Sequence, residues 1–110
     1  MSPDTIRQLA QNCRRKDMRS LGFPRDWQPY KIQNPEFPGY TFTDISAWEF
    51  IADKLEQDPK FDVIPLDNPK GAKALVMKIP LPSDQVLYIK VQIGSGIKAI
   101  GRSFHVSDIY

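Results

Sequence analysis

The sequence predicts an α+β fold in which two N-terminal helices are followed by a roughly four-stranded antiparallel sheet. Two segments, 2–21 and 44–57, carry apolar residues at helical spacing, whereas the later part of the chain carries short apolar runs between turn-forming clusters. These turns are too short to hold a crossover helix, so neighbouring strands are expected to run antiparallel. A length of 110 residues with 41% hydrophobic residues predicts one domain spanning 1–110.

The first predicted helix covers residues 2–21. Ser2 can cap its N-terminus, and Pro3 suits the first helical position because its missing N–H would have no helical partner. Gly22 is expected to end the helix. We therefore interpret residues 1–22 as a helical N-terminal extension. Its apolar stripe consists of Ile6, Leu9 and Cys13.

Residues 23–43 are predicted to form an ordered but irregular arm. Proline fixes φ and removes a backbone donor, so regular strand pairing is not expected in this segment. Large rings are costly to leave in water, so we expect the aromatic side chains to pack onto the domain; the alternative is that nucleobases stack on them. The prolines are Pro24, Pro29, Pro35 and Pro38, and the aromatic residues are Phe23, Trp27, Tyr30, Phe37, Tyr40 and Phe42.

The second predicted helix spans 44–57, and residues 44–110 are expected to comprise this helix and the sheet. Asp44 or Ser46 can cap it, and Ser46 with Glu49 fits a capping box. Its carboxylates lack the spacing of metal ligands, so we interpret them as a solvated face and predict neither a metal nor a cofactor. The apolar stripe is Ile45, Trp48, Ile51, Ala52 and Leu55, and the carboxylates are Glu49, Asp53, Glu56 and Asp58.

The rest of the chain is predicted to form the strands. DNPKG at 67–71 and GSG at 94–96 are typical of turns, and Pro80 is expected to end a strand. Between the two turns, the segment 86–93 alternates apolar and polar residues with a period of two, as a half-buried strand does. The predicted strands are 61–65, 73–79, 86–93 and 97–106.

The register of the last two strands decides which side chains share a face. A three-residue turn would pair Tyr88 with Arg102, whereas a two- or four-residue loop would pair Tyr88 with Ser103. We prefer the second register because it buries more apolar surface. Its consequence is that Arg102 points to the apolar side, where it must reach an edge or pair with a carboxylate. The apolar layer would then contain Leu87, Ile89, Val91, Ile100, Phe104 and Val106.

The opposite face of these strands is a candidate site for cleaving RNA. Cleavage through the 2′-hydroxyl needs a base for the 2′ proton, a cation beside the phosphate and an acid for the leaving 5′ oxygen. His105 or Tyr88 can transfer protons, and Lys90 and Arg102 can hold the phosphate. Without such a function, these residues are ordinary strand residues. The polar face carries Tyr88, Lys90, Gln92, Ser103 and His105, with Ser103 and Gln92 as further RNA-binding candidates.

Charge is distributed unevenly along the chain, although the net charge is only +2. Residues 1–31 hold seven basic and three acidic residues, residues 35–68 hold two basic and eight acidic residues, and residues 69–110 hold six basic and two acidic residues. Basic segments on either side of an acidic middle favour a polyanionic partner near the two ends. The alternative is that most of these charges form solvated surface.

The segments LYIKVQI and KAIGRSFH resemble the closing strands of small bacterial toxin RNases of the RelE and MqsR type. The resemblance implies a barnase–colicin–RelE type of fold and a metal-independent endoribonuclease that cleaves messenger RNA, with the ribosome as one setting. It also implies a cognate antitoxin protein as partner. On this basis Tyr88 and His105 would be catalytic, and Lys90 and Arg102 would bind phosphate.

Two other functions fit the same sequence. One is a small non-enzymatic protein-interaction module, and the other is an RNA-binding module that does not cleave RNA. A cytoplasmic location without membrane association is expected in each case. The first residues lack a signal-peptide layout, no run of about 18 apolar residues occurs, and Cys13 is the single cysteine.

Overall fold

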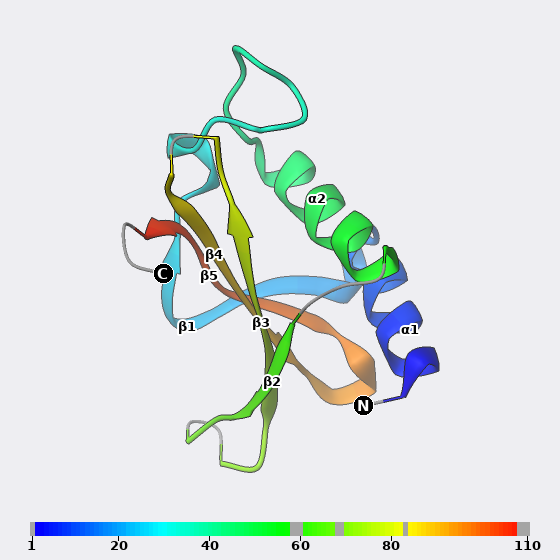
Figure 1. The fold of residues 1–110 in the computed structure, drawn as a ribbon. Helices are drawn as coiled ribbons and strands as arrows, with labels where there is room; N and C mark the ends of the chain where they lie inside the picture. Colours follow the sequence, from blue (N-terminus) through cyan, green and yellow to red (C-terminus); the bar gives the residue numbers. More distant parts are fainter. Residues whose placement is uncertain (1, 58–60, 68–69, 83, 108–110) are drawn as a thin grey trace.

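Two helices pack against one face of a five-stranded mixed sheet in the computed structural model, which describes residues 2–57, 61–67, 70–82 and 84–107 (Figure 1). The sheet order is β1-β5-β4-β3-β2. The α+β class is thereby confirmed, but the described residues contain one strand more than predicted. The elements are α1 (Pro3–Cys13), β1 (Arg19–Trp27), α2 (Asp44–Glu56), β2 (Asp62–Pro65), β3 (Lys73–Pro80), β4 (Val86–Ile93) and β5 (Ala99–Ser107).

The additional strand, β1, overturns the prediction of a helix over 2–21. Helix α1 ends at Cys13, and the following segment forms a short 3-10 turn at Lys16–Met18 before β1 pairs in parallel with β5. The physical reason is that the apolar stripe ends at Cys13. The next four residues are all charged, so a longer helix would have no apolar side chains to pack against the sheet. Leu21 and Trp27 instead pack over Gly101, where the absence of a side chain leaves space for them. A Cβ at this position would lie only 2.7 Å from the Trp27 ring.

Both helices begin at hydrogen-bonding caps. The predicted cap of α1 is confirmed, since the Thr5 backbone N–H donates to Ser2 Oγ at 3.2 Å. Helix α2 is capped by Thr43, so the predicted caps Asp44 and Ser46 are wrong, and the capping box joins Thr43 to Ser46 and not Ser46 to Glu49. Ser46 is the third helical residue, and its hydroxyl accepts from the Thr43 N–H at 2.7 Å while its own N–H donates to Thr43 Oγ1 at 3.0 Å.

A cluster of ion pairs joins the two helices. The guanidinium of Arg14 contacts Glu49 at 3.1 Å and Asp53 at 2.6 Å, and it also pairs with Glu56. The predicted solvated face of α2 is therefore partly neutralised by α1. The four side chains remain partly exposed, so water screens the pairs and their contribution to stability is modest.

The segment after β1 forms the arm, and only part of it packs as predicted. Phe42 is buried and contacts Phe104, with ring centroids 5.0 Å apart, and Gln33 forms an isolated bridge with Thr41. The prediction that the rings pack onto the domain is wrong for four aromatic residues, which stay largely in solvent because no described element covers them. These residues are Phe23 on β1 and Tyr30, Phe37 and Tyr40 on the arm.

The register of β4 and β5 differs from both predicted alternatives. Tyr88 pairs with His105, and a β-bulge at Arg102 shifts the ladder between Lys90–Ser103 and Val91–Gly101. Phe104 lies opposite Ile89 in the apolar layer, as predicted. The predictions for two other residues were wrong because the bulge reverses their faces. Ile100 lies opposite Gln92 on the polar face, and Arg102 bonds to Gln92 on that same face.

The core lies between the helices and the sheet. Trp48 of α2 is buried against Trp27 of β1, with ring centroids 5.1 Å apart, and against the central apolar residues of β4 and β5. Burial raises the pKa of the Cys13 thiol to about 12, so this side chain stays protonated at neutral pH and acts as part of the core. In the described part of the chain, no helix has both the length and the apolar character to cross a bilayer.

We expect Trp48→Ala to lower the free energy of unfolding by about 3–5 kcal/mol, because it removes a buried ring and leaves a cavity beside Trp27. Urea titration followed by circular dichroism measures this change. Tyr40→Ala is the matched control, since that ring is exposed and its loss should leave stability almost unchanged. Equal midpoints for Trp48→Ala and the unsubstituted protein would show that this packing is misassigned.

Candidate active site

The face of the sheet opposite the helices carries a row of reactive side chains across three strands. Lys78 of β3 lies opposite Tyr88 of β4, and Tyr88 lies opposite His105 of β5. Side chains directly opposite one another on the same face are close enough to interact. The prediction that alternation places Tyr88 and His105 on one face is therefore confirmed by the register, and the row gains a lysine.

Tyr88 and His105 form a stacked pair. Their ring centroids lie 5.3 Å apart, and the ring planes are inclined by 27°. Both residues are only partly buried, so the pair is accessible from solvent. The stacking holds two groups that can transfer protons side by side on a rigid sheet, where their orientation is set by the backbone ladder.

A carboxylate from β1 lies beside the imidazole. Nε2 of His105 is 3.9 Å from Oδ2 of Asp26, and the side-chain amide of Gln28 donates to Oδ1 of Asp26 at 2.6 Å. On the other side of the ring, Nδ1 is 3.3 Å from the carbonyl oxygen of Val106. A carboxylate at this position attracts the imidazolium once the ring has taken a proton and favours one orientation of the ring.

Two lysines supply positive charge to this face. Lys78 is exposed, and Lys90, which is partly buried, lies opposite Ser103. Ser103 in turn is paired with Asp26 of β1. The predicted site residues Lys90 and Ser103 are thus brought to the same face as Tyr88 and His105, where an ammonium group can meet a phosphate oxygen.

Arg102 and Gln92 lie on the same face, nearer the turn that joins β4 to β5, and both side chains are almost inaccessible to solvent. Arg102 is only 6% exposed, and its guanidinium donates to Gln92 Oε1 at 2.6 Å and to the carbonyl oxygen of Pro24 at 2.9 Å. These contacts make Arg102 a poor phosphate ligand, because binding a phosphate would break its hydrogen bonds, including the one to the buried Gln92. Its position instead explains how β1 is held to β5.

Pro24 belongs to a segment, residues 22–25, that bulges out of β1 and that we call the β1 hook. The pairing of β1 with β5 shifts between Leu21 and Asp26, so the hook faces the single bulge residue Arg102. The hook lies against Arg102, which in turn bonds to the buried Gln92, whereas Lys78, Tyr88 and His105 keep part of their surface exposed.

Sequence reasoning missed Lys78 and Asp26 as site residues. The signal for Lys78 was available, because alternation in the strand 73–79 assigns its face once the pairing with the next strand is drawn. Asp26 had no such signal. Its segment was expected to be irregular, so its position beside His105 follows only from the parallel pairing of β1 with β5.

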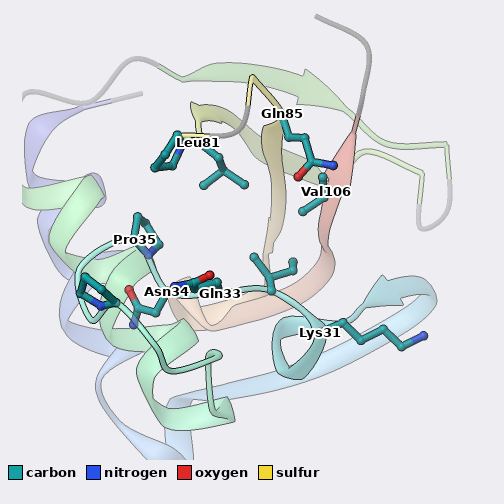
Figure 2. A pocket seen from close by; sticks show the side chains of 10 residues that line it. Lys31, Gln33, Asn34, Pro35, Leu81, Gln85 and Val106 are labelled. Atoms are coloured by element: carbon teal, nitrogen blue, oxygen red, sulfur yellow. The ribbon is translucent and has the colours of Figure 1, made fainter.

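A separate cleft of about 350 Å³ lies between the arm and the turn that joins β3 to β4 (Figure 2). Val106, which lies opposite Leu87, contributes from the helix-covered side of the sheet, so the cleft does not share a face with Tyr88 and His105. Its lining contains amides, prolines and aliphatic groups with one cation, which suits binding better than proton transfer. The lining residues are Lys31, Ile32, Gln33, Asn34, Pro35, Pro38, Leu81, Pro82, Gln85 and Val106.

Within the described ranges, no group of three or more His, Cys, Asp or Glu side chains is arranged to hold a metal ion. Comparison with known proteins adds no assignment: no protein-family model, no curated protein and no solved structure matches this chain.

We expect Arg102→Met to destabilise the fold by about 1–3 kcal/mol, because it removes the guanidinium that donates to the buried Gln92 Oε1 and to the Pro24 carbonyl. Chemical denaturation measures the loss. Lys78→Met removes a cation from the same face at an exposed position and should change stability by less than about 0.5 kcal/mol. Equal effects of the two substitutions would contradict the structural role given to Arg102.

Proposed function

We propose that the protein is a metal-independent endoribonuclease of the bacterial toxin type, with the Tyr88–His105 pair as its catalytic centre. The observation that carries the proposal is the stacked pair itself, which is accessible to solvent and lies between Lys78 and Asp26 on the open face of the sheet. An acid–base pair with a lysine beside it contains the groups that RNA cleavage through the 2′-hydroxyl requires.

In the proposed reaction, His105 takes the proton of the 2′-hydroxyl as the 2′ oxygen attacks the adjacent phosphorus. A bond forms between phosphorus and the 2′ oxygen, and the bond between phosphorus and the 5′ oxygen breaks. The Tyr88 phenol gives its proton to the leaving 5′ oxygen, so the products are a 2′,3′-cyclic phosphate and a 5′-hydroxyl. Proton exchange with water then restores neutral His105 and the Tyr88 phenol.

The spacing of the two rings is compatible with His105 acting as the base and Tyr88 as the acid. In an in-line displacement the attacking and leaving oxygens lie on opposite sides of phosphorus, so each oxygen needs its own proton-transfer group within reach. The centroids of Tyr88 and His105 are 5.3 Å apart, which allows one group to serve each oxygen. Asp26, whose Oδ2 is 3.9 Å from His105 Nε2, stabilises the imidazolium that forms after proton transfer.

In this scheme two lysines stabilise the extra negative charge that develops on the phosphate. Lys78 lies directly opposite Tyr88, and Lys90 lies two residues farther along β4 on the same face. Ammonium groups beside a developing negative charge stabilise it and so lower the barrier. Lys90 keeps its predicted role in this scheme, Lys78 takes the phosphate-binding role predicted for Arg102, and Ser103 remains a candidate for RNA contacts. Gln92 loses its predicted RNA-binding role because it is buried and its Oε1 accepts from Arg102.

The toxin assignment rests on the resemblance of LYIKVQI and KAIGRSFH to the closing strands of RelE- and MqsR-type RNases. Both segments lie in or beside the neighbouring strands β4 and β5, and they supply both members of the proposed catalytic pair. The proposal includes messenger RNA as substrate, a cognate antitoxin protein that neutralises the activity, and action in the cytoplasm.

A second candidate function is a non-enzymatic protein-interaction module. The observation that favours it is the exposure of Tyr30, Phe37 and Tyr40 on the arm, since exposed aromatic rings are typical of protein interfaces. Purified protein that neither binds nor cleaves RNA at moderate salt would favour this function. Protein that binds RNA without cleaving it would instead support an RNA-binding module.

We expect His105→Ala and Tyr88→Phe each to lower the rate of RNA cleavage by about 100- to 10,000-fold, because each removes one proton-transfer group. Neither change should alter the circular dichroism spectrum. The measurement is the rate of cleavage of a single-stranded RNA with EDTA present, alongside growth of cells that express each variant. Arrest of growth by the unsubstituted protein should be relieved by His105→Ala.

Tyr30→Phe is the matched control, because it removes a phenolic hydroxyl from an exposed tyrosine on the arm. Its cleavage rate should equal that of the unsubstituted protein. A cleavage rate that both His105→Ala and Tyr88→Phe leave unchanged would exclude this catalytic centre.

A further inference from the structure

The β1 hook presents an aromatic ring to solvent. Phe23 is 73% exposed, although burial of a phenylalanine side chain is strongly favourable. The backbone beside it is fixed, because the Pro24 carbonyl accepts a hydrogen bond from the almost fully buried Arg102 at 2.9 Å. The guanidinium carbon of Arg25 lies 4.3 Å from the centre of the ring, which is a cation–π contact.

The hook borders the proposed catalytic centre. A Cβ on Gly22 would lie 2.7 Å from Ile100 and 3.0 Å from Arg102, which places the start of the hook against the open face. At its other end, Arg25 is followed directly by Asp26, whose carboxylate is 3.9 Å from His105. The hook therefore leads directly to the carboxylate beside His105.

We propose that Phe23 and Arg25 form a subsite in which a nucleobase of the bound RNA strand stacks on the ring and Arg25 contacts the neighbouring phosphate. This inference rests on the proposed endoribonuclease function and narrows its substrate to single-stranded RNA, because bases within a duplex are not free to stack on a protein ring. Aromatic stacking tolerates every base, so the subsite contributes affinity rather than sequence preference.

The contacts of Phe23 distinguish it from the other exposed rings. Tyr40 is exposed to the same extent, 73%, but it lies on the arm between Gln33 and Phe42, and no cation contacts its ring among the described interactions. The backbone beside Phe23 is held by the hydrogen bond from Arg102 to the Pro24 carbonyl before RNA binds, so little backbone ordering is required on binding. Both a π-face and a cation are thus available where a nucleotide next to the scissile phosphate would lie.

The test is binding of a fluorescein-labelled, single-stranded 2′-O-methyl oligoribonucleotide, followed by fluorescence anisotropy at fixed salt. This probe cannot be cleaved through the 2′-hydroxyl, so binding is measured apart from catalysis. Phe23→Ala should weaken binding by about 5- to 150-fold, which is the range expected for one lost base stack. Tyr40→Ala should bind like the unsubstituted protein, and Phe23→Trp should retain binding.

Arg25→Gln provides a second, independent variant. It should weaken binding and lower the slope of log affinity against log salt concentration by about 0.7, the value expected for one lost phosphate contact on a single strand. A duplex RNA of the same sequence should show no difference between Phe23→Ala and Tyr40→Ala.

Three results would overturn the subsite. Equal affinity of Phe23→Ala and the unsubstituted protein for the single-stranded probe, while the unsubstituted protein still cleaves RNA, would remove the subsite and leave the proposed function standing. Loss of a protein partner by Phe23→Ala with unchanged RNA affinity would reassign the ring to a protein interface. Absence of both binding and cleavage in the unsubstituted protein would overturn the proposed function, and the subsite with it.

Discussion

The bulge at Arg102 is the constraint on which the rest of the structure depends. Arg102 and His105 are three residues apart and would alternate onto opposite faces, but the bulge lets both lie on the open face, where Gln92 and the Pro24 carbonyl accept hydrogen bonds from the guanidinium. The same bulge moves the ladder so that Tyr88 lies opposite His105. One extra residue in β5 therefore avoids a buried unpaired charge, attaches β1 to the sheet and sets the geometry of the proposed catalytic pair.

The open face is divided into two parts with different roles. The part beneath the β1 hook is sealed by hydrogen bonds and stabilises the parallel pairing of β1 with β5. The other part leaves Lys78, Tyr88 and His105 accessible on strands that the helices support from behind. The reactive groups are therefore carried by rigid strands. Arg102, which lies against the hook, stabilises the fold and has no role in the proposed reaction.

Local patterns in the sequence predicted much of this fold. Alternation placed Tyr88 and His105 on one face, and helical spacing identified the stripe around Trp48. The patterns failed where long-range packing decided the structure. The segment containing Gly22 and Pro24 forms a strand because Leu21 and Trp27 pack over Gly101. The local sequence of this segment gives no indication that a glycine much later in the chain provides this space. The position of Asp26 in the site depends on the same pairing, so it could not be anticipated.

The most direct test of the catalytic assignment is to identify, by mass spectrometry, the ends that the purified protein leaves on an unstructured RNA oligonucleotide with EDTA present. The account predicts 2′,3′-cyclic phosphate and 5′-hydroxyl ends, and no such products with His105→Ala. Ends carrying a 3′-hydroxyl and a 5′-phosphate, the same products from His105→Ala, or an RNA left intact by the unsubstituted protein would each contradict it.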